Sequence, residues 1–206
     1  MRLDDRCLLF FIRSPGKGNV KSRLAAAIGH ELTVKLYKSF VLQMLSTLKK
    51  GNFAFYVCFH PENALKGLKK WLGGRHHYIP QEGKDLGERM KNAFAAAFQT
   101  GFKRVVLIGS DIPDLPLEFI QEAFTSLEEK DAVIGPAYDG GYYLIGFTDK
   151  AFSPKVFEGM TWGTKTVFDD TMKVLEGLQK KVYTLKPLRD IDTVEDLIEI
   201  GDGFTF

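Results

Sequence analysis

One aspartate stands where α/β proteins commonly place a functional carboxylate. Asp111 follows closely after a short, continuous apolar run at residues 105–108 (VVLI), a pattern typical of a strand buried on both faces of a parallel sheet. Pro113 and Pro116 prevent that strand from continuing, so we expect Asp111 at the carboxyl edge of the sheet, where open α/β folds bind ligands. At that edge the carboxylate either binds a metal ion and serves catalysis or caps the helix that begins near Pro116.

A basic, glycine-containing loop follows the first apolar run. Between residues 13 and 24 it carries the cations Arg13, Lys17, Lys21 and Arg23 and the glycines Gly16 and Gly18. Glycines let the backbone approach a ligand, and cations ahead of a helix start can neutralise a di- or triphosphate. The loop matches neither the Walker sequence nor the dinucleotide fingerprint. We predict that it binds nucleotide phosphates, because it should emerge at the same edge as Asp111; the alternative is a solvated basic loop.

A second acidic segment, DIDTVEDL at residues 190–197, follows the last predicted strand. Asp190 and Asp192 are expected near the same edge, where they would share a divalent ion with Asp111. Mg²⁺ takes only one or two protein carboxylates, with phosphate oxygens and water completing its shell. The alternative is structural, because Asp192 followed by Glu195 matches a helix capping box. A cap and a metal ligand do not exclude each other.

The segment QEGKDLGERM supplies polar groups for a nucleotide. Gln81 can pair with a base edge as donor and acceptor, or it is ordinary loop polarity before a helix that Asp85 caps. Arg89 lies on the first turn of that helix, where it either reaches a phosphate or pairs with Glu88 or Asp85.

Two later residues suit the binding and activation of an acceptor. Asp139 precedes Gly140 and Gly141, so it is a catalytic base, an acceptor-binding carboxylate or the first residue of a tight turn. Trp162 either stacks on a sugar and covers the site or is a half-buried structural side chain.

The elements that must position these residues alternate between strand and helix patterns. Strands are predicted at residues 7–12, 53–59, 76–80, 105–108, 132–136, 140–147 and 182–185, the 140–147 strand forming an edge hairpin. Helices are predicted at residues 31–50, 61–72, 86–97, 116–130 and 164–179, with a short one from Thr193. This alternation predicts one three-layer α/β domain over residues 1–206 with a mainly parallel mixed sheet.

Composition excludes several other classes of protein. The chain has 206 residues and a formal net charge of +2, which does not suggest a nucleic-acid binder. Cys7 and Cys58 lie in apolar runs, which predicts that both are buried thiols in a protein of a reducing compartment. No signal pattern and no apolar run long enough to span a bilayer is present, so we expect a soluble cytoplasmic protein.

Taken together, several segments resemble the nucleotide-diphospho-sugar transferase superfamily, and most closely a bacterial subfamily provisionally labelled glycosyltransferase. They are RSPGKGNVKSRLA, QEGKDLGERM, VVLIGSDIPDL, GPAYDGGYYLIG and DIDTVEDL. The resemblance implies a Rossmann-like domain of the glycosyltransferase A type that binds a nucleotide through Mg²⁺ or Mn²⁺. It implies that Asp111 is the metal-binding aspartate, that Asp192 is a second ligand, and that Gln81 and Gly87 hold the base.

A weaker similarity points to nucleotidyl transfer. KSRLA at residues 21–25 is similar to the loop of phospholactate guanylyltransferases, although DGGYYLIG replaces their Gly-Thr-Asn pattern. The molybdenum-cofactor nucleotidyltransferases are more distant, and the region around Asp111 offers a single Asp where many sugar transferases carry Asp-x-Asp.

These observations converge on a metal-dependent transferase that uses an activated nucleotide. In the leading hypothesis a sugar passes from a nucleotide-diphospho-sugar to a small-molecule acceptor that Asp139 activates. In the first alternative a nucleoside monophosphate passes from a nucleoside triphosphate to a phosphorylated acceptor, and in the second the domain binds nucleotide without turnover. We expect neither a nucleic-acid partner nor a membrane-spanning segment. A homodimer is compatible with the sequence.

Overall fold

The computed structural model describes residues 5–16 and 20–200, and all seven strands belong to one sheet. The strands are β1 (Arg6–Arg13), β2 (Ala54–His60), β3 (His77–Pro80), β4 (Arg104–Ile108), β5 (Ala132–Pro136), β6 (Tyr142–Thr148) and β7 (Val182–Thr184). Their order in space is β3-β2-β1-β4-β6-β5-β7, and β6 alone runs antiparallel to its neighbours.

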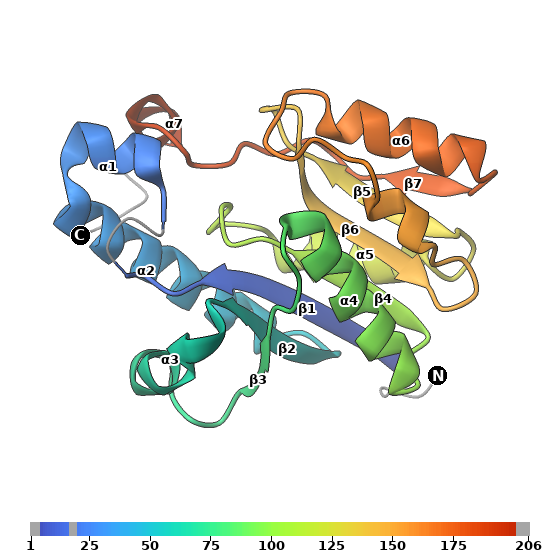
Figure 1. Cartoon of the computed structure of the whole chain (residues 1–206), viewed down its shortest axis with the longest axis horizontal. Coiled ribbons are helices and arrows are strands. Elements are labelled where there is room, and N and C mark those ends of the chain that lie inside the picture. The colour runs from blue at the N-terminus through green and yellow to red at the C-terminus, as the bar shows by residue number, and fades with distance from the viewer. Residues whose placement is uncertain (1–4, 17–19, 201–206) are drawn as a thin grey trace.

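Helices cover both faces of the sheet (Figure 1). The α-helices are α1 (Ser22–Ile28), α2 (His30–Leu48), α3 (Leu65–Leu72), α4 (Leu86–Gln99), α5 (Leu117–Ser126), α6 (Val167–Gly177) and α7 (Val194–Ile200). Two short 3₁₀ helices are η2 (Glu62–Ala64) and η3 (Pro154–Phe157). None of the helices in the described ranges has the length and apolarity to cross a bilayer.

The alternation of side chains along each strand divides the core into two layers. On β1, Phe10 packs in the cluster that α2, α3 and α5 cover, whereas Phe11 packs in the cluster that α4, η3 and α6 cover. Both thiols are buried in the second cluster, and burial raises the pKa of Cys7 and of Cys58. The three-layer α/β fold with a mainly parallel mixed sheet is therefore confirmed.

A third, smaller cluster lies beyond the carboxyl edge of the sheet. It joins Leu24 of α1, Leu36 and Phe40 of α2, and Ile191 of the segment after β7, with Val194 of α7 packed against it. The basic loop and the C-terminal acidic segment are therefore anchored in the same group of apolar side chains.

Two predictions about the elements were wrong. The strand at 140–147 does form a hairpin with β5, but β6 lies between β4 and β5 rather than at the edge, because its side chains are buried on both faces. Gly146 suits this interior position, since a Cβ there would lie 2.9 Å from side-chain atoms of both Val106 and Val133. The helix predicted to reach residue 130 ends at Ser126, after which the buried Leu127 turns into the core.

Candidate functional site

The topology brings the predicted site segments to one edge of the sheet. β1 and β4 are parallel neighbours, with Phe10 opposite Ile108, so the end of β1 at Arg13 and the turn that holds Asp111 lie at the same edge of the sheet. Because β6 is reversed, the turn between β5 and β6, which carries Asp139, opens at the same edge.

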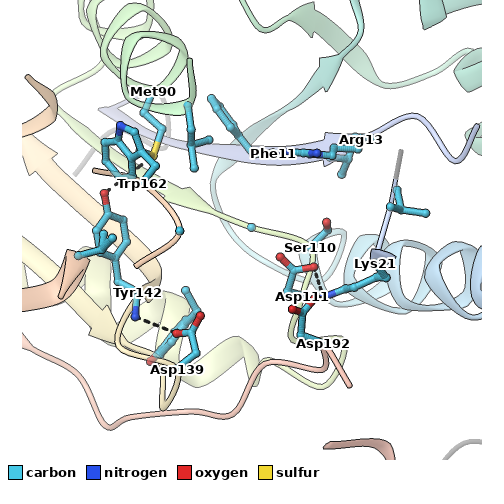
Figure 2. A pocket seen from close by; sticks show the side chains of 18 of the residues that line it. Phe11, Arg13, Lys21, Met90, Ser110, Asp111, Asp139, Tyr142, Trp162 and Asp192 are labelled. Carbon is cyan, nitrogen blue, oxygen red and sulfur yellow. Dashed lines mark hydrogen bonds and ion pairs between the residues drawn. The ribbon is translucent and has the colours of Figure 1, made fainter. Parts of the chain in front are cut away.

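Lys21 and two aspartates form the centre of the site (Figure 2). The Nζ atom of Lys21 lies 2.5 Å from Oδ1 of Asp111 and 3.7 Å from Oδ1 of Asp192, and only 5% of the Lys21 side chain is exposed. Arg23, which is exposed, places Nη1 3.4 Å from Oδ2 of Asp192. Asp111 is therefore not a helix cap: α5 begins after Pro116 without a side-chain cap.

The backbone of Lys21 is in the left-handed region, with φ 48° and ψ 56°. A residue with a Cβ adopts this conformation at a cost of about 1–3 kcal/mol, and such residues are found preferentially at functional sites. The conformation stands directly before α1 and turns the long side chain towards the two aspartates.

Asp192 is free of the capping role that its sequence suggested. The cap of α7 is the pair Thr193 and Asp196: the Thr193 hydroxyl accepts from the N–H of Asp196, and Oδ2 of Asp196 accepts from the N–H groups of Asp192 and Thr193. The predicted Asp192–Glu195 capping box was therefore wrong by one position, and the Asp192 carboxylate faces Lys21 and Arg23 instead.

The donor set around Lys21 fits a divalent cation. Two partly exposed carboxylates already share one positive charge, and Mg²⁺ and Mn²⁺ are bound by few protein oxygens when phosphate supplies the others. In the described part of the chain, no group of three or more His, Cys, Asp or Glu side chains is placed to hold a metal ion. A site here would therefore rest on Asp111 and Asp192 together with ligand and water.

Asp190 lies in a different setting from Asp192. It lines a smaller cavity of about 120 Å³ with Asp111 and Asp139. Burial, followed by the charge of Asp139, raises the pKa of Asp190 to about 6, while Lys21 acts in the opposite direction.

Because folding raises the pKa of Asp190, we expect the stability of the protein to depend on pH. A carboxyl whose pKa is raised on folding favours the folded state when protonated, so this contribution is present below about pH 4 and is lost as the pH rises through about 6. Asp190→Asn should therefore raise the Tm more at pH 8 than at pH 5, in thermal scans with EDTA. Asp114→Asn, at an exposed loop position, should leave this pH dependence unchanged. An equal shift at both pH values would contradict the prediction.

A cavity of about 400 Å³, within the range of small-molecule sites, runs from Lys21 to Trp162. Of the residues singled out in the sequence it is lined by Arg13, Lys21, Gln81, Asp111, Asp139, Gly141, Trp162 and Asp192. The remaining described candidates Gly16, Arg23, Gly87, Arg89, Gly140 and Asp190 do not line it, and Lys17 lies outside the described residues.

Gln81 and Arg89 both donate side-chain hydrogen bonds to backbone carbonyls. The Gln81 side-chain amide donates hydrogen bonds to the carbonyls of Cys58 (2.8 Å) and Ile12 (3.2 Å), so a base would meet only its carbonyl oxygen. Arg89 donates from Nε to the carbonyl of Gly83 at 2.9 Å. Asp85 caps α4 as predicted, its Oδ1 accepting from the N–H of Glu88 at 2.8 Å.

Asp139 is both a turn residue and part of the cavity wall. Its Oδ1 accepts a hydrogen bond from the N–H of Gly141 at 2.8 Å, which fixes the carboxylate at the edge of both cavities. Gly140 has φ 91°, and a Cβ there would lie 2.1 Å from the carbonyl oxygen of Lys165, so this turn requires glycine.

Tyr37, a buried residue of α2 that was not among the predicted site residues, organises the site through its hydroxyl. It accepts from the N–H of Arg13 at 2.8 Å and lies 3.1 Å from the hydroxyl of Ser110, which joins the ends of β1 and β4. Burial raises the pKa of Tyr37 to about 12. A hydroxyl on the buried face of a helix was the available signal, because a buried tyrosine needs a partner for its O–H.

Gly87 has a packing role beside Trp162. A Cβ at this position would lie 2.6 Å from the indole Nε1 of Trp162 and 2.7 Å from the carbonyl oxygen of Phe157. Gly87→Ala should therefore lower the free energy of unfolding by about 1–3 kcal/mol and displace Trp162, detected as a lower Tm with a shift in tryptophan emission. Gly67→Ala on α3, where a Cβ would meet nothing within 4 Å, should be neutral or stabilising. Equal effects would rule out the packing role.

Comparisons with known proteins agree with this architecture. A family model described as "uncharacterized protein conserved in bacteria" (DUF2064) matches residues 42–164. A protein of Desulfovibrio desulfuricans G20, provisionally described as a nucleotide-diphospho-sugar transferase, is 42% identical, with 97% of this chain and 87% of that chain covered and a TM-score of 0.93.

Two more distant structures share the fold. Molybdopterin-guanine dinucleotide biosynthesis protein A of Archaeoglobus fulgidus is 15% identical, with 94% and 95% of the two chains covered and a TM-score of 0.57. Rv0371c of Mycobacterium tuberculosis H37Rv, solved in complex with manganese, is 13% identical, with 97% and 98% covered and a TM-score of 0.58. The resemblance predicted from the sequence is thus confirmed, and the chain belongs to the bacterial DUF2064 family within the nucleotide-diphospho-sugar transferase superfamily.

Proposed function

We propose that the protein is a transferase that uses an activated nucleotide and, more narrowly, that it moves a sugar from a nucleotide-diphospho-sugar to a small-molecule acceptor. The observation that carries the proposal is the cluster of Lys21, Asp111 and Asp192 at one end of a cavity that reaches Asp139 at the other side. The similarity to the D. desulfuricans protein supports it.

The roles of the residues follow from their chemistry. Asp111 and Asp192 would hold Mg²⁺ or Mn²⁺, which when bound neutralises charge on the donor phosphates. Lys21 and Arg13 bind the same phosphates. As the acceptor oxygen bonds to the sugar carbon, the bond from that carbon to the diphosphate oxygen breaks, its electron pair leaves on the diphosphate, and the acceptor proton passes to Asp139.

A thermal-shift panel of nucleoside triphosphates, nucleoside diphosphates and nucleotide sugars, with and without Mn²⁺, tests the proposal. A ligand at 100 times its Kd adds about 2.7 kcal/mol, or roughly 5–10 °C for a domain of this size. We expect a nucleotide sugar and its diphosphate to give the largest shifts, and only with metal. A larger shift with a triphosphate would favour nucleotidyl transfer, and binding without any product would favour a non-catalytic module. No metal-dependent shift with any ligand would overturn the proposal.

A further inference from the structure

The cavity has two chemically different halves. The charged half contains Arg13, Lys21, Asp111 and Asp192. The apolar half, as we name it, is lined by Phe11, Leu86, Met90, Tyr142, Trp162 and Val167. Figure 2 shows Lys21, Asp111 and Asp192 together on one side, with Met90, Tyr142 and Trp162 on the other and Asp139 beneath Tyr142.

The apolar half is bounded by negative charge. Among the described residues, the cations that line the cavity are Arg13 and Lys21, and both belong to the end of β1 or the loop beyond it. Asp139 stands at the edge of the apolar half, and Asp190 lies behind it in the smaller cavity. An acceptor phosphate or carboxylate bound here would lose water and face Asp139, with no cation among the described residues that line this half, which is unfavourable.

The walls of the apolar half are held in place by packing. The rings of Tyr142 and Trp162 meet edge to face, with centroids 6.5 Å apart and planes at 81°. The indole of Trp162 also rests against Gly87, and the sulfur of the buried Met90 lies 4.0 Å from the Tyr142 hydroxyl. Such a surface is preorganised for an apolar or aromatic group.

We propose that the apolar half selects an uncharged acceptor, which places an apolar or aromatic group against Trp162 and Met90 and presents a hydroxyl to Asp139. This inference rests on the proposed function and adds the chemical class of the acceptor. It favours glycosyl transfer to a hydroxyl over transfer of a nucleotide to an acceptor phosphate.

Trp162 serves as a reporter for this half of the cavity. The chain contains two tryptophans, and Trp71 packs against the core on the opposite face of the sheet. The buried indole nitrogen of Trp71 has no hydrogen-bond partner within the described ranges, so Trp71→Phe removes no such bond and leaves Trp162 as the one indole fluorophore.

The experiment titrates the full-length Trp71→Phe protein with three probes and follows Trp162 emission without metal or nucleotide. The probes are phenyl β-D-glucopyranoside, methyl β-D-glucopyranoside and the 6-phosphate of the phenyl glucoside, which differ by one group each. We expect the phenyl glucoside to bind at least tenfold more tightly than either of the others.

Charge is tested separately by a lysine at the rim of the cavity. Thr164 is exposed and lines the cavity, so Thr164→Lys should improve binding of the phosphorylated probe at least fivefold. Thr125→Lys, at an exposed position of α5, should not change it.

Three results would overturn the inference: tightest binding of the phosphorylated probe, equal affinity for the phenyl and methyl glucosides, or no response to any probe up to millimolar concentrations. Because the titration contains neither metal nor nucleotide, its failure is distinguishable from failure of the nucleotide panel.

Discussion

Asp111→Asn is expected to reduce metal-dependent turnover of the donor by about a hundred- to a thousandfold. The substitution keeps the shape of the side chain but removes the negative charge that would hold the divalent ion, whose charge neutralisation contributes several kcal/mol to the transition state. Binding of Mn²⁺, followed through the EPR signal of the free ion, should weaken at least tenfold in the same variant. Both effects are expected because Asp111 lies at the strand end where the proposed donor phosphates would bind.

The control for this prediction is Asp114→Asn, three residues further along the same turn. Asp114 is exposed and does not line the cavity, so turnover and Mn²⁺ binding should stay at wild-type values. Because Asp111→Asn leaves the buried Lys21 with only the more distant Asp192, the Tm of each protein is measured first and all assays are run well below the lowest. Unchanged Mn²⁺ affinity in folded Asp111→Asn would remove Asp111 from the metal site.

Lys21→Met should change the affinities for metal and for nucleotide in opposite directions. The ammonium of Lys21 lies close to both aspartates, where it would compete with a divalent ion in the absence of nucleotide. Its removal should therefore tighten Mn²⁺ binding severalfold. With nucleotide present, loss of a charge-assisted contact to phosphate should weaken nucleotide binding by roughly 10- to 100-fold.

Calorimetric titrations of Mn²⁺ alone and of the nucleotide in excess Mn²⁺ measure the two affinities. Lys35→Met is the matched control, because Lys35 forms an exposed pair with Glu31 on the surface of α2. If both affinities fell together, Lys21 would be a structural support for the loop and not a competitor of the metal.

The strands of the sheet could be predicted from the sequence because they are encoded by continuous, clearly bounded apolar runs. Uninterrupted apolar runs such as residues 7–12 and 105–108 are the pattern of strands covered on both faces, and they became β1 and β4 at the centre of the sheet. Once those two strands are neighbours, the position of Asp111 beside the basic loop follows from topology alone.

The contacts within the site depended on details that a linear pattern does not contain. The cap of α7 begins at Thr193 and not at Asp192, a difference of one position along the chain. This difference leaves the Asp192 carboxylate free to face Lys21. The engagement of the Gln81 amide by two strand carbonyls likewise depends on how β1, β2 and β3 end relative to one another.

The small cluster of Leu24, Leu36, Phe40 and Ile191 determines how the protein should respond to C-terminal truncation. Ile191 also donates its backbone N–H to the carbonyl of Asp111 at 3.0 Å, so the C-terminal segment is tied to the loop after β1 and to the turn after β4 at once. A truncation after β7 would keep every strand yet uncover Leu24 and release the helix that follows Lys21. In a series of 3′ deletions of the gene, ligand response should therefore disappear before the fold does.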